Sequence, residues 1–270
     1  MRETTTLQRR TGGGFMRGFS PLFQKESKTW WGGRRWLFQA ILWQVVINGL
    51  LFMVLFVLPG VVPADSGMTA DPVLNGLQGF FNIGALVLAI GVITLAQDAL
   101  TAEVQSGTAE WLLAKPVTRQ AFILAKFAAQ AIGMLVVLTL LPGLVGYILL
   151  SVAGTVSLSG FVAGLAVLAL HTTFYLVLTF LLGALTRNRM ITLAGGLVVL
   201  FTGQVAMSLA PLLGVNMALL PTPWPLTAVA TALAGGLDLP AQMFIPIGAT
   251  IIGCVLGLLA TIVLFDRLEL

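Results

Sequence analysis

Few residues of this chain carry side chains that could perform covalent or metal chemistry. The sequence has one histidine, His171, and one cysteine, Cys254. It therefore cannot form an intramolecular disulfide or a zinc site built from several histidines or cysteines. Neither residue has a charged neighbour in its own apolar segment, which favours packing roles for both. The phosphate loop Gly-x4-Gly-Lys-Ser/Thr does not occur in the sequence, so this chain is not expected to hydrolyse ATP by the usual phosphate cradle.

Turn-forming, polar and apolar residues follow one another in a distinct order between residues 97 and 126. Gly107 can turn the chain, Thr108 can cap a short helix, and Glu110 lies in its first turn, where a negative charge favours the helix dipole. Pro116 ends this helix after about two turns. Its apolar face consists of Trp111, Leu112 and Leu113. This helix is too short to span the membrane, and its face is too apolar to lie in water. The face is therefore expected on a membrane surface or in a partner's groove.

The same segment resembles the cytoplasmic motif of type-two ABC exporter permeases, six-span membrane subunits that pair with a separate ATPase. The shared pattern is Glu-x3-Gly-Thr-x-Glu-x-Leu-Leu-x2-Pro-Val-x-Arg. The resemblance implies a coupling region that receives the ATPase stroke, with ATP and magnesium on the partner chain and no cofactor on this one. With Trp111 added from the apolar face, its residues are Glu103, Gly107, Thr108, Glu110, Trp111, Leu112, Leu113, Pro116, Val117 and Arg119. The alternative is a solvated loop whose charges only set topology.

The composition of the whole chain indicates the class of fold that positions this segment. Hydrophobic residues make up 58% of the 270 residues and charged residues only 9%, whereas a soluble domain carries about 25% charged residues. With a mean hydropathy of +1.00, the chain has too little polar surface for a water-exposed globule. We therefore expect an all-α integral membrane protein.

Charge-free stretches long enough for the hydrocarbon core predict six spans. Their centres lie near residues 37–58, 80–97, 127–150, 160–185, 191–210 and 244–265. Residues 211–243 are also uncharged up to Leu237, but Pro221, Pro223 and Pro225 interrupt them. A partly re-entrant or interfacial segment is predicted there, with a seventh span as the alternative.

The amino-terminal region before the spans falls into two parts. Residues 1–14, which include three consecutive glycines, predict a flexible cytoplasmic tail. Residues 15–36 carry aromatic residues at helical spacing with charges between them, which predicts an amphipathic interfacial helix broken at Gly32 and Gly33. A disordered basic tail is the alternative. The six-span permease domain would occupy residues 37–270.

The basic residues predict the orientation. In the six-span reading all fourteen Lys and Arg fall on one side, and the opposite loops hold only Asp65, Asp71 and Asp238. Because basic loops stay inside, both termini are expected in the cytoplasm and the protein in the inner (cytoplasmic) membrane. Topology thus explains the net charge of +4, and no nucleic-acid partner is expected.

Amide side chains inside the spans have two open interpretations. They could line a substrate pathway or bridge helices, and bridging is the simpler account. The candidates are Gln44, Asn48, Asn82 and Gln204. Since no charged residue lies in the core of a span, an ion-coupled transporter lacks a coupling site, and an apolar or amphipathic cargo is favoured.

These observations together predict the membrane subunit of an ATP-driven exporter that works by alternating access. Its expected partners are a cytoplasmic ABC ATPase, a second copy or similar permease, and membrane lipid. The alternative is a non-transporting scaffold or mechanotransmitter coupled to the same ATPase. An intramembrane enzyme is disfavoured because no nucleophile and base occur together in the spans.

Overall fold

The structure, a computed structural model, describes residues 16–61, 71–105, 117–214, 220–237 and 239–266. Every regular element within these ranges is helical, which confirms the expected all-α fold. In this described part, six helices are long and apolar enough to cross a membrane. Their bounds are Arg35–Gly60, Pro72–Glu103, Arg119–Ala153, Leu158–Thr186, Arg189–Leu213 and Ala241–Asp266. Six spans are thereby confirmed, and each expected centre lies inside one of these helices.

Several long helices begin earlier than their apolar centres indicate because a polar side chain caps the first turn. The caps are Asp71 for α3 (Pro72–Ala96), Thr118 for α6 (Arg119–Met134), Ser157 for α8 (Leu158–Thr186) and Asn188 for α9 (Arg189–Leu209). The first and third spans each contain one π-helical turn, at Met53–Val57 and Leu135–Leu140. The second of these directly precedes Pro142, where the wider turn accommodates a residue without an N–H group.

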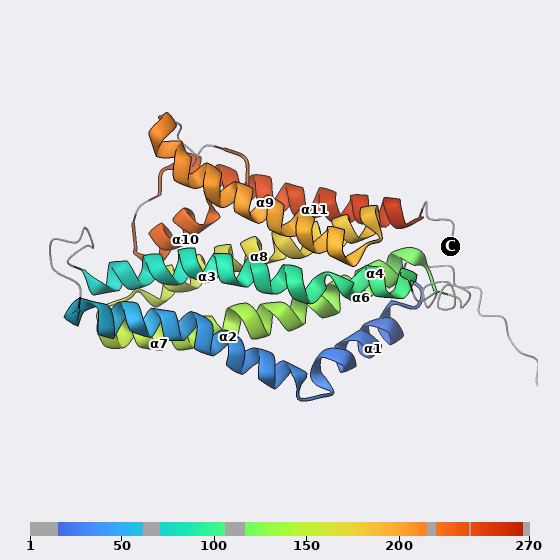
Figure 1. The fold of residues 1–270 in the computed structure, drawn as a ribbon, viewed down its shortest axis with the longest axis horizontal. Helices are drawn as coiled ribbons and strands as arrows, with labels where there is room; N and C mark the ends of the chain where they lie inside the picture. Colours follow the sequence, from blue (N-terminus) through green and yellow to red (C-terminus); the bar gives the residue numbers. More distant parts are fainter. Residues whose placement is uncertain (1–15, 62–70, 106–116, 215–219, 238, 267–270) are drawn as a thin grey trace, which may run out of the picture.

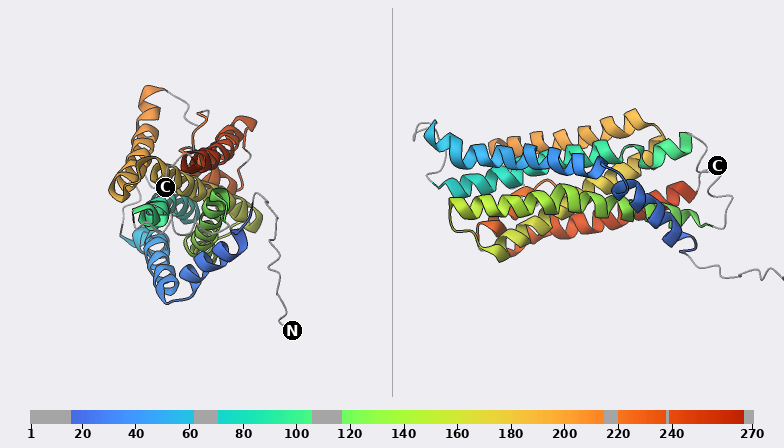
Figure 2. Two further views of the ribbon diagram at one scale, coloured as in Figure 1. Left: turned by 90° about the vertical axis from the view of Figure 1, so that its right-hand side faces the viewer. Right: turned by 90° about the horizontal axis from the view of Figure 1, so that it is seen from below.

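Helices α3 and α8 form the centre of the bundle. α8 packs against α3, α9, α10 (Leu226–Ala234) and α11 (Ile245–Asp266). Phe80, Phe81 and Phe161 join α3 to α8 with ring centroids 5.2–5.7 Å apart, and all three rings are buried. Seen end-on in Figure 2, α1 (Phe19–Trp31) and α2 (Arg35–Phe52) lie on one side of this centre and α9 and α11 on the other.

Helix α1 runs obliquely across one end of the bundle and packs on α6 (Figure 1). It ends at Gly32, and α2 begins at Arg35, so the break falls where the two glycines indicate. Leu22 is the buried anchor of α1. The interfacial position of this helix in a bilayer stays a prediction, and the expected tail, residues 1–14, lies outside the described residues.

Helix α10 lies inside the bundle beside the first turns of α8. A Cβ on Gly160 would lie 2.5 Å from the Leu233 carbonyl oxygen, and one on Gly164 would lie 2.6 Å from that of Ala230. Just before α10, the Pro223 backbone lies beside the ring of His171, in the middle of α8. With nine residues, α10 is too short to be a seventh span. Whether this segment is re-entrant in a bilayer stays a prediction.

Candidate functional site

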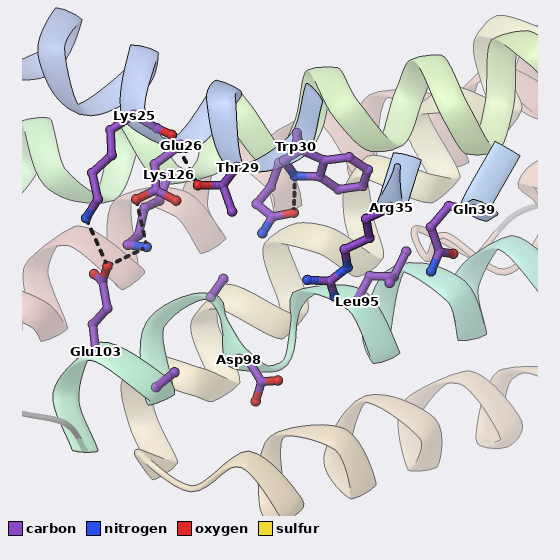
Figure 3. A pocket seen from close by; sticks show the side chains of 13 residues that line it. Lys25, Glu26, Thr29, Trp30, Arg35, Gln39, Leu95, Asp98, Glu103 and Lys126 are labelled. Carbon is purple, nitrogen blue, oxygen red and sulfur yellow. Dashed lines mark hydrogen bonds and ion pairs between the residues drawn. The ribbon is translucent and has the colours of Figure 1, made fainter. Parts of the chain in front are cut away.

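A cluster of charges around the buried Lys126 lies at the end of the bundle where α1, α4 (Asp98–Gln105) and α6 meet. The Lys126 Nζ atom lies 3.2 Å from Glu26 Oε1 and 3.1 Å from Glu103 Oε1. Lys25 Nζ approaches the same Glu103 oxygen at 3.9 Å. Lys126 is only 6% exposed. We call Lys25, Glu26, Glu103 and Lys126 the charge cluster (Figure 3).

Matching turns of α1 and α6 hold this cluster in place. Glu26 and Trp30 are one turn apart on α1, as are Lys126 and Gln130 on α6. Glu26 pairs with Lys126, and the Trp30 indole N–H donates to Gln130 Oε1 at 2.9 Å. Gly133 leaves room for the Trp30 ring, which a Cβ there would meet at 2.5 Å. These contacts join α1 to α6 over two successive turns.

The predicted coupling region begins and ends beside this cluster. Glu103 belongs to it, and Val117 packs on Gly18, where a Cβ would lie 2.7 Å from Val117 Cγ2. The Thr118 N–H donates to the Arg17 carbonyl at 3.1 Å, and Gly18 adopts φ +88°, a left-handed conformation that favours glycine. The residues between them, Gly107, Thr108, Glu110, Trp111, Leu112, Leu113 and Pro116, lie outside the described residues.

Arg119 joins the third span to the last one. Its Nη1 atom donates to the carbonyls of Phe265 at 3.3 Å and Asp266 at 2.7 Å, at the carboxyl end of α11. A cation at a helix carboxyl terminus satisfies carbonyls that have no partner within the helix. Arg189 similarly pairs with Asp98 at 3.1 Å, linking α9 to α4. The second, third, fifth and sixth spans are thus tied together at this end.

The pathway amides do not form one site. Asn48 donates to Gln44 within α2 and to the Pro142 carbonyl of α7 (Leu141–Ala153) at 3.2 Å. Asn82 is exposed and donates to the Gln78 carbonyl of its own helix at 2.9 Å. Gln204 is half-buried on α9. Neither Asn82 nor Gln204 hydrogen-bonds the other two amides in the part of the chain that the structure describes.

Other reactive side chains do not form a catalytic or metal site in the described ranges. His171 is buried, and its ring lies 5.0 Å from that of Tyr175. The backbones of Pro223 and Ala85 lie nearby, but neither ring nitrogen has a hydrogen bond to another described residue. No group of three or more His, Cys, Asp or Glu among the described residues could hold a metal ion.

The sequence alone does not bring the members of the charge cluster together. Glu26 and Lys25 belonged to the amphipathic segment, and Lys126 counted as one base among fourteen. The one available signal is that Glu26/Trp30 and Lys126/Gln130 share a one-turn spacing of complementary residues. That signal becomes specific only once α1 is known to lie on α6.

The helical fold and the charge cluster define a polytopic membrane protein whose described charged residues lie mainly at one end of the bundle. Residues 42–270 match the family model described as ABC-2 family transporter protein. The chain belongs to this family, so it is an integral membrane permease of ABC transport. A comparison with curated proteins finds no match. The family is a membrane transport component, not itself catalytic, that typically works with a cytoplasmic ATPase.

Proposed function

We propose that this chain forms the membrane pathway of an ATP-driven exporter that moves an apolar or amphipathic substrate by alternating access. The family assignment supports the transport role. The described Lys and Arg residues lie in or just before α1 and α2, in the first eight residues of α6, just beyond α8 and at the start of α9. Asp98 and Glu103 lie at the end of the second span, so the middle of each span is uncharged. An uncharged interior suits an apolar or amphipathic cargo better than a bare ion.

The observation that carries the coupling proposal is the charge cluster. α4 leads into the predicted coupling segment and α6 leads out of it, and Lys126 joins both to α1 through Glu103 and Glu26. A displacement of the segment would therefore pull on the second span, the third span and α1 together. The proposed residues for ATPase contact are those of the motif between Glu103 and Arg119.

The basic residues at the end with the charge cluster also indicate the proposed orientation in the membrane. Basic residues favour the cytoplasmic side, so the charge cluster, both termini and the ATPase would lie in the cytoplasm and the protein in the inner membrane. The opposite end, with the start of α3 and the carboxyl end of α10, would face outward (Figure 1). The segment from Leu220 to Ala234 would then enter the membrane from the outer side, shielded by α8 and α9 as non-helical backbone requires. A second permease copy would complete the pathway.

The experiment is co-purification of a cytoplasmic ABC ATPase subunit with this chain. Leu112→Asp with Leu113→Asp places two carboxylates on the proposed apolar contact face, where burial of unpaired charge costs several kcal/mol. We expect the ATPase to be lost while the permease remains folded. The matched control is Leu112→Met with Leu113→Met, which keeps the face apolar and should retain the ATPase. Retention of the ATPase by both pairs would refute the coupling role.

A further inference from the structure

The charge cluster forms one wall of a cavity of about 310 Å³. Trp30 of α1, Arg35 and Gln39 of α2, and Leu95, Ala99 and Ala102 from the second span and α4 line the rest of it. A volume of about 300–1,000 Å³ is usual for small-molecule sites. Figure 3 shows the Arg35 side chain extending from the start of α2 toward Leu95 and the cavity.

Arg35 differs from the other charges around this cavity. Glu26 and Glu103 face Lys126, and Asp98 faces Arg189 at 3.1 Å, so each acidic residue lies beside a base. Arg35 lines the cavity and forms no salt bridge with any described residue. A guanidinium presents five N–H donors in a planar fork that matches phosphate or carboxylate geometry. Three bases and three acids line the cavity, and Arg189, outside the lining, pairs with Asp98. Arg35 is therefore the lining base left without an acidic partner among the described residues, which favours an anionic ligand there.

The surroundings of Arg35 place the cavity at the edge of the hydrocarbon. Arg35 opens the first span, and the next exposed residues along α2, Phe38 and Ile41, are apolar and each 64% exposed. The tryptophan rings of Trp31 and Trp36 lie 5.7 Å apart beside this helix start. Tryptophan and arginine together are typical of the level where lipid headgroups meet acyl chains. A water-soluble anion would make no favourable contact with the adjoining apolar surface.

We infer that this cavity binds the phosphodiester headgroup of a glycerophospholipid. Arg35 contacts the phosphate, Gln39 and Trp30 border the headgroup, and the acyl chains lie along the exposed apolar face of α2. The site rests on the placement of α2 in a membrane and does not depend on coupling to an ATPase. Because Trp30 and Lys126 join α1 to α6, a bound headgroup would also stabilise the contact between these helices.

The test uses the purified full chain in detergent and measures its thermal unfolding midpoint as phosphatidylglycerol is added. Diacylglycerol with the same acyl chains tests the phosphate, and inorganic phosphate tests the lipid source. The variants are Arg35→Gln and Arg34→Gln, which remove the same charge from adjacent exposed positions, of which only Arg35 lines the cavity.

We expect phosphatidylglycerol to raise the midpoint of the wild type and of Arg34→Gln. Arg35→Gln should need about ten-fold more lipid for the same rise, since a hydrogen bond to a charged group is lost. Equal responses of the two variants would overturn the site, as would equal stabilisation by diacylglycerol. Equal stabilisation by inorganic phosphate would assign the cavity to a soluble anion and overturn the lipid assignment.

A second variant keeps the inference testable if Arg35→Gln does not fold. Ala102 lines the cavity at an exposed position of α4, so Ala102→Phe fills the space without changing charge. We expect this variant to fold and to lose the phospholipid response. A full response with Phe at 102 would contradict a headgroup in this cavity. An ATPase that still co-purifies with these variants separates the lipid site from the coupling proposal.

Discussion

At the scale of single residues, burial decides which polar side chains matter for the fold. Lys126 is 6% exposed and lies between the carboxylates of Glu26 and Glu103, whereas Lys28 of α1 is exposed. Asn48 is 6% exposed and reaches across to the third span. The amide side chains of the spans thus have different roles that their residue type alone does not reveal.

Replacing Lys126 by methionine should lower the free energy of unfolding by about 1–3 kcal/mol, because the partly buried carboxylates of Glu26 and Glu103 lose their nearest counter-charge. Chemical denaturation of the purified permease in detergent measures the change. Lys28→Met is the matched control and should lie within about 0.5 kcal/mol of the wild type. Similar values for the two variants would mean that the charge cluster contributes little to stability.

Asn48→Leu tests the role of the amide pair. The substitution removes hydrogen bonds to Gln44 and to the Pro142 carbonyl, so we expect a loss of about 0.6–2 kcal/mol in stability. Asn82→Leu, at an exposed position bonded within its own helix, should change stability by less. Unchanged stability of Asn48→Leu would favour the pathway role over helix bridging.

At the scale of helices, small residues permit the close packing of neighbouring helices. Gly160-x3-Gly164 receives the carbonyls of α10, while Gly253 of the similar Gly253-x3-Gly257 has no atom within 4 Å of where a Cβ would lie. The two motifs look alike in the sequence. They differ in packing because both glycines of the first motif meet carbonyls of α10, whereas in the second only Gly257 is closely packed, with a Cβ position 2.7 Å from Val177 Cγ1 of α8.

Gly164→Ala should therefore destabilise the permease by about 1–3 kcal/mol, since its Cβ would lie 2.6 Å from the Ala230 carbonyl and 2.9 Å from Phe81. Gly253→Ala should be neutral or stabilising by up to about 1 kcal/mol. Thermal unfolding of both variants in detergent gives the comparison. A neutral Gly164→Ala variant would show that α10 does not pack closely on α8.

The helices also show which features of the fold could be predicted from the sequence. Uncharged lengths and turn residues were enough for six spans and for the α1–α2 break at Gly32, because each depends on local composition. The charge cluster could not be predicted, since Glu26 and Lys126 meet through tertiary packing over a hundred positions. Likewise, the hydrogen bond from Arg119 to the end of α11 is a tertiary contact that the sequence does not show, and the coupling role of Arg119 stays a prediction.

At the scale of the whole molecule, the two ends differ in chemistry. The end with α1, α4 and the start of α6 gathers the described bases, and the other end holds the start of α3, which Asp71 caps (Figure 1). This asymmetry supports an orientation with the charge cluster in the cytoplasm.

Cysteine labelling tests that orientation in intact cells. In a Cys254→Ser background, Ser66→Cys should react with an impermeant thiol reagent from outside, and Ser106→Cys should react only after the membrane is permeabilised. Permeabilised cells provide the control that both sites are reactive. External labelling at position 106 would contradict the proposed topology.

The most direct test of an ATP-driven permease is whether ATP binding at the cytoplasmic end changes the conformation of the outer end. Ser159→Cys, at an exposed position of the first turn of α8, would report on the outer end through its rate of maleimide labelling in the ATPase complex in nanodiscs. We predict that ATP with magnesium changes this rate several-fold in the wild-type background. An unchanged rate, with the ATPase bound and hydrolysing ATP, would contradict alternating access driven through the coupling region.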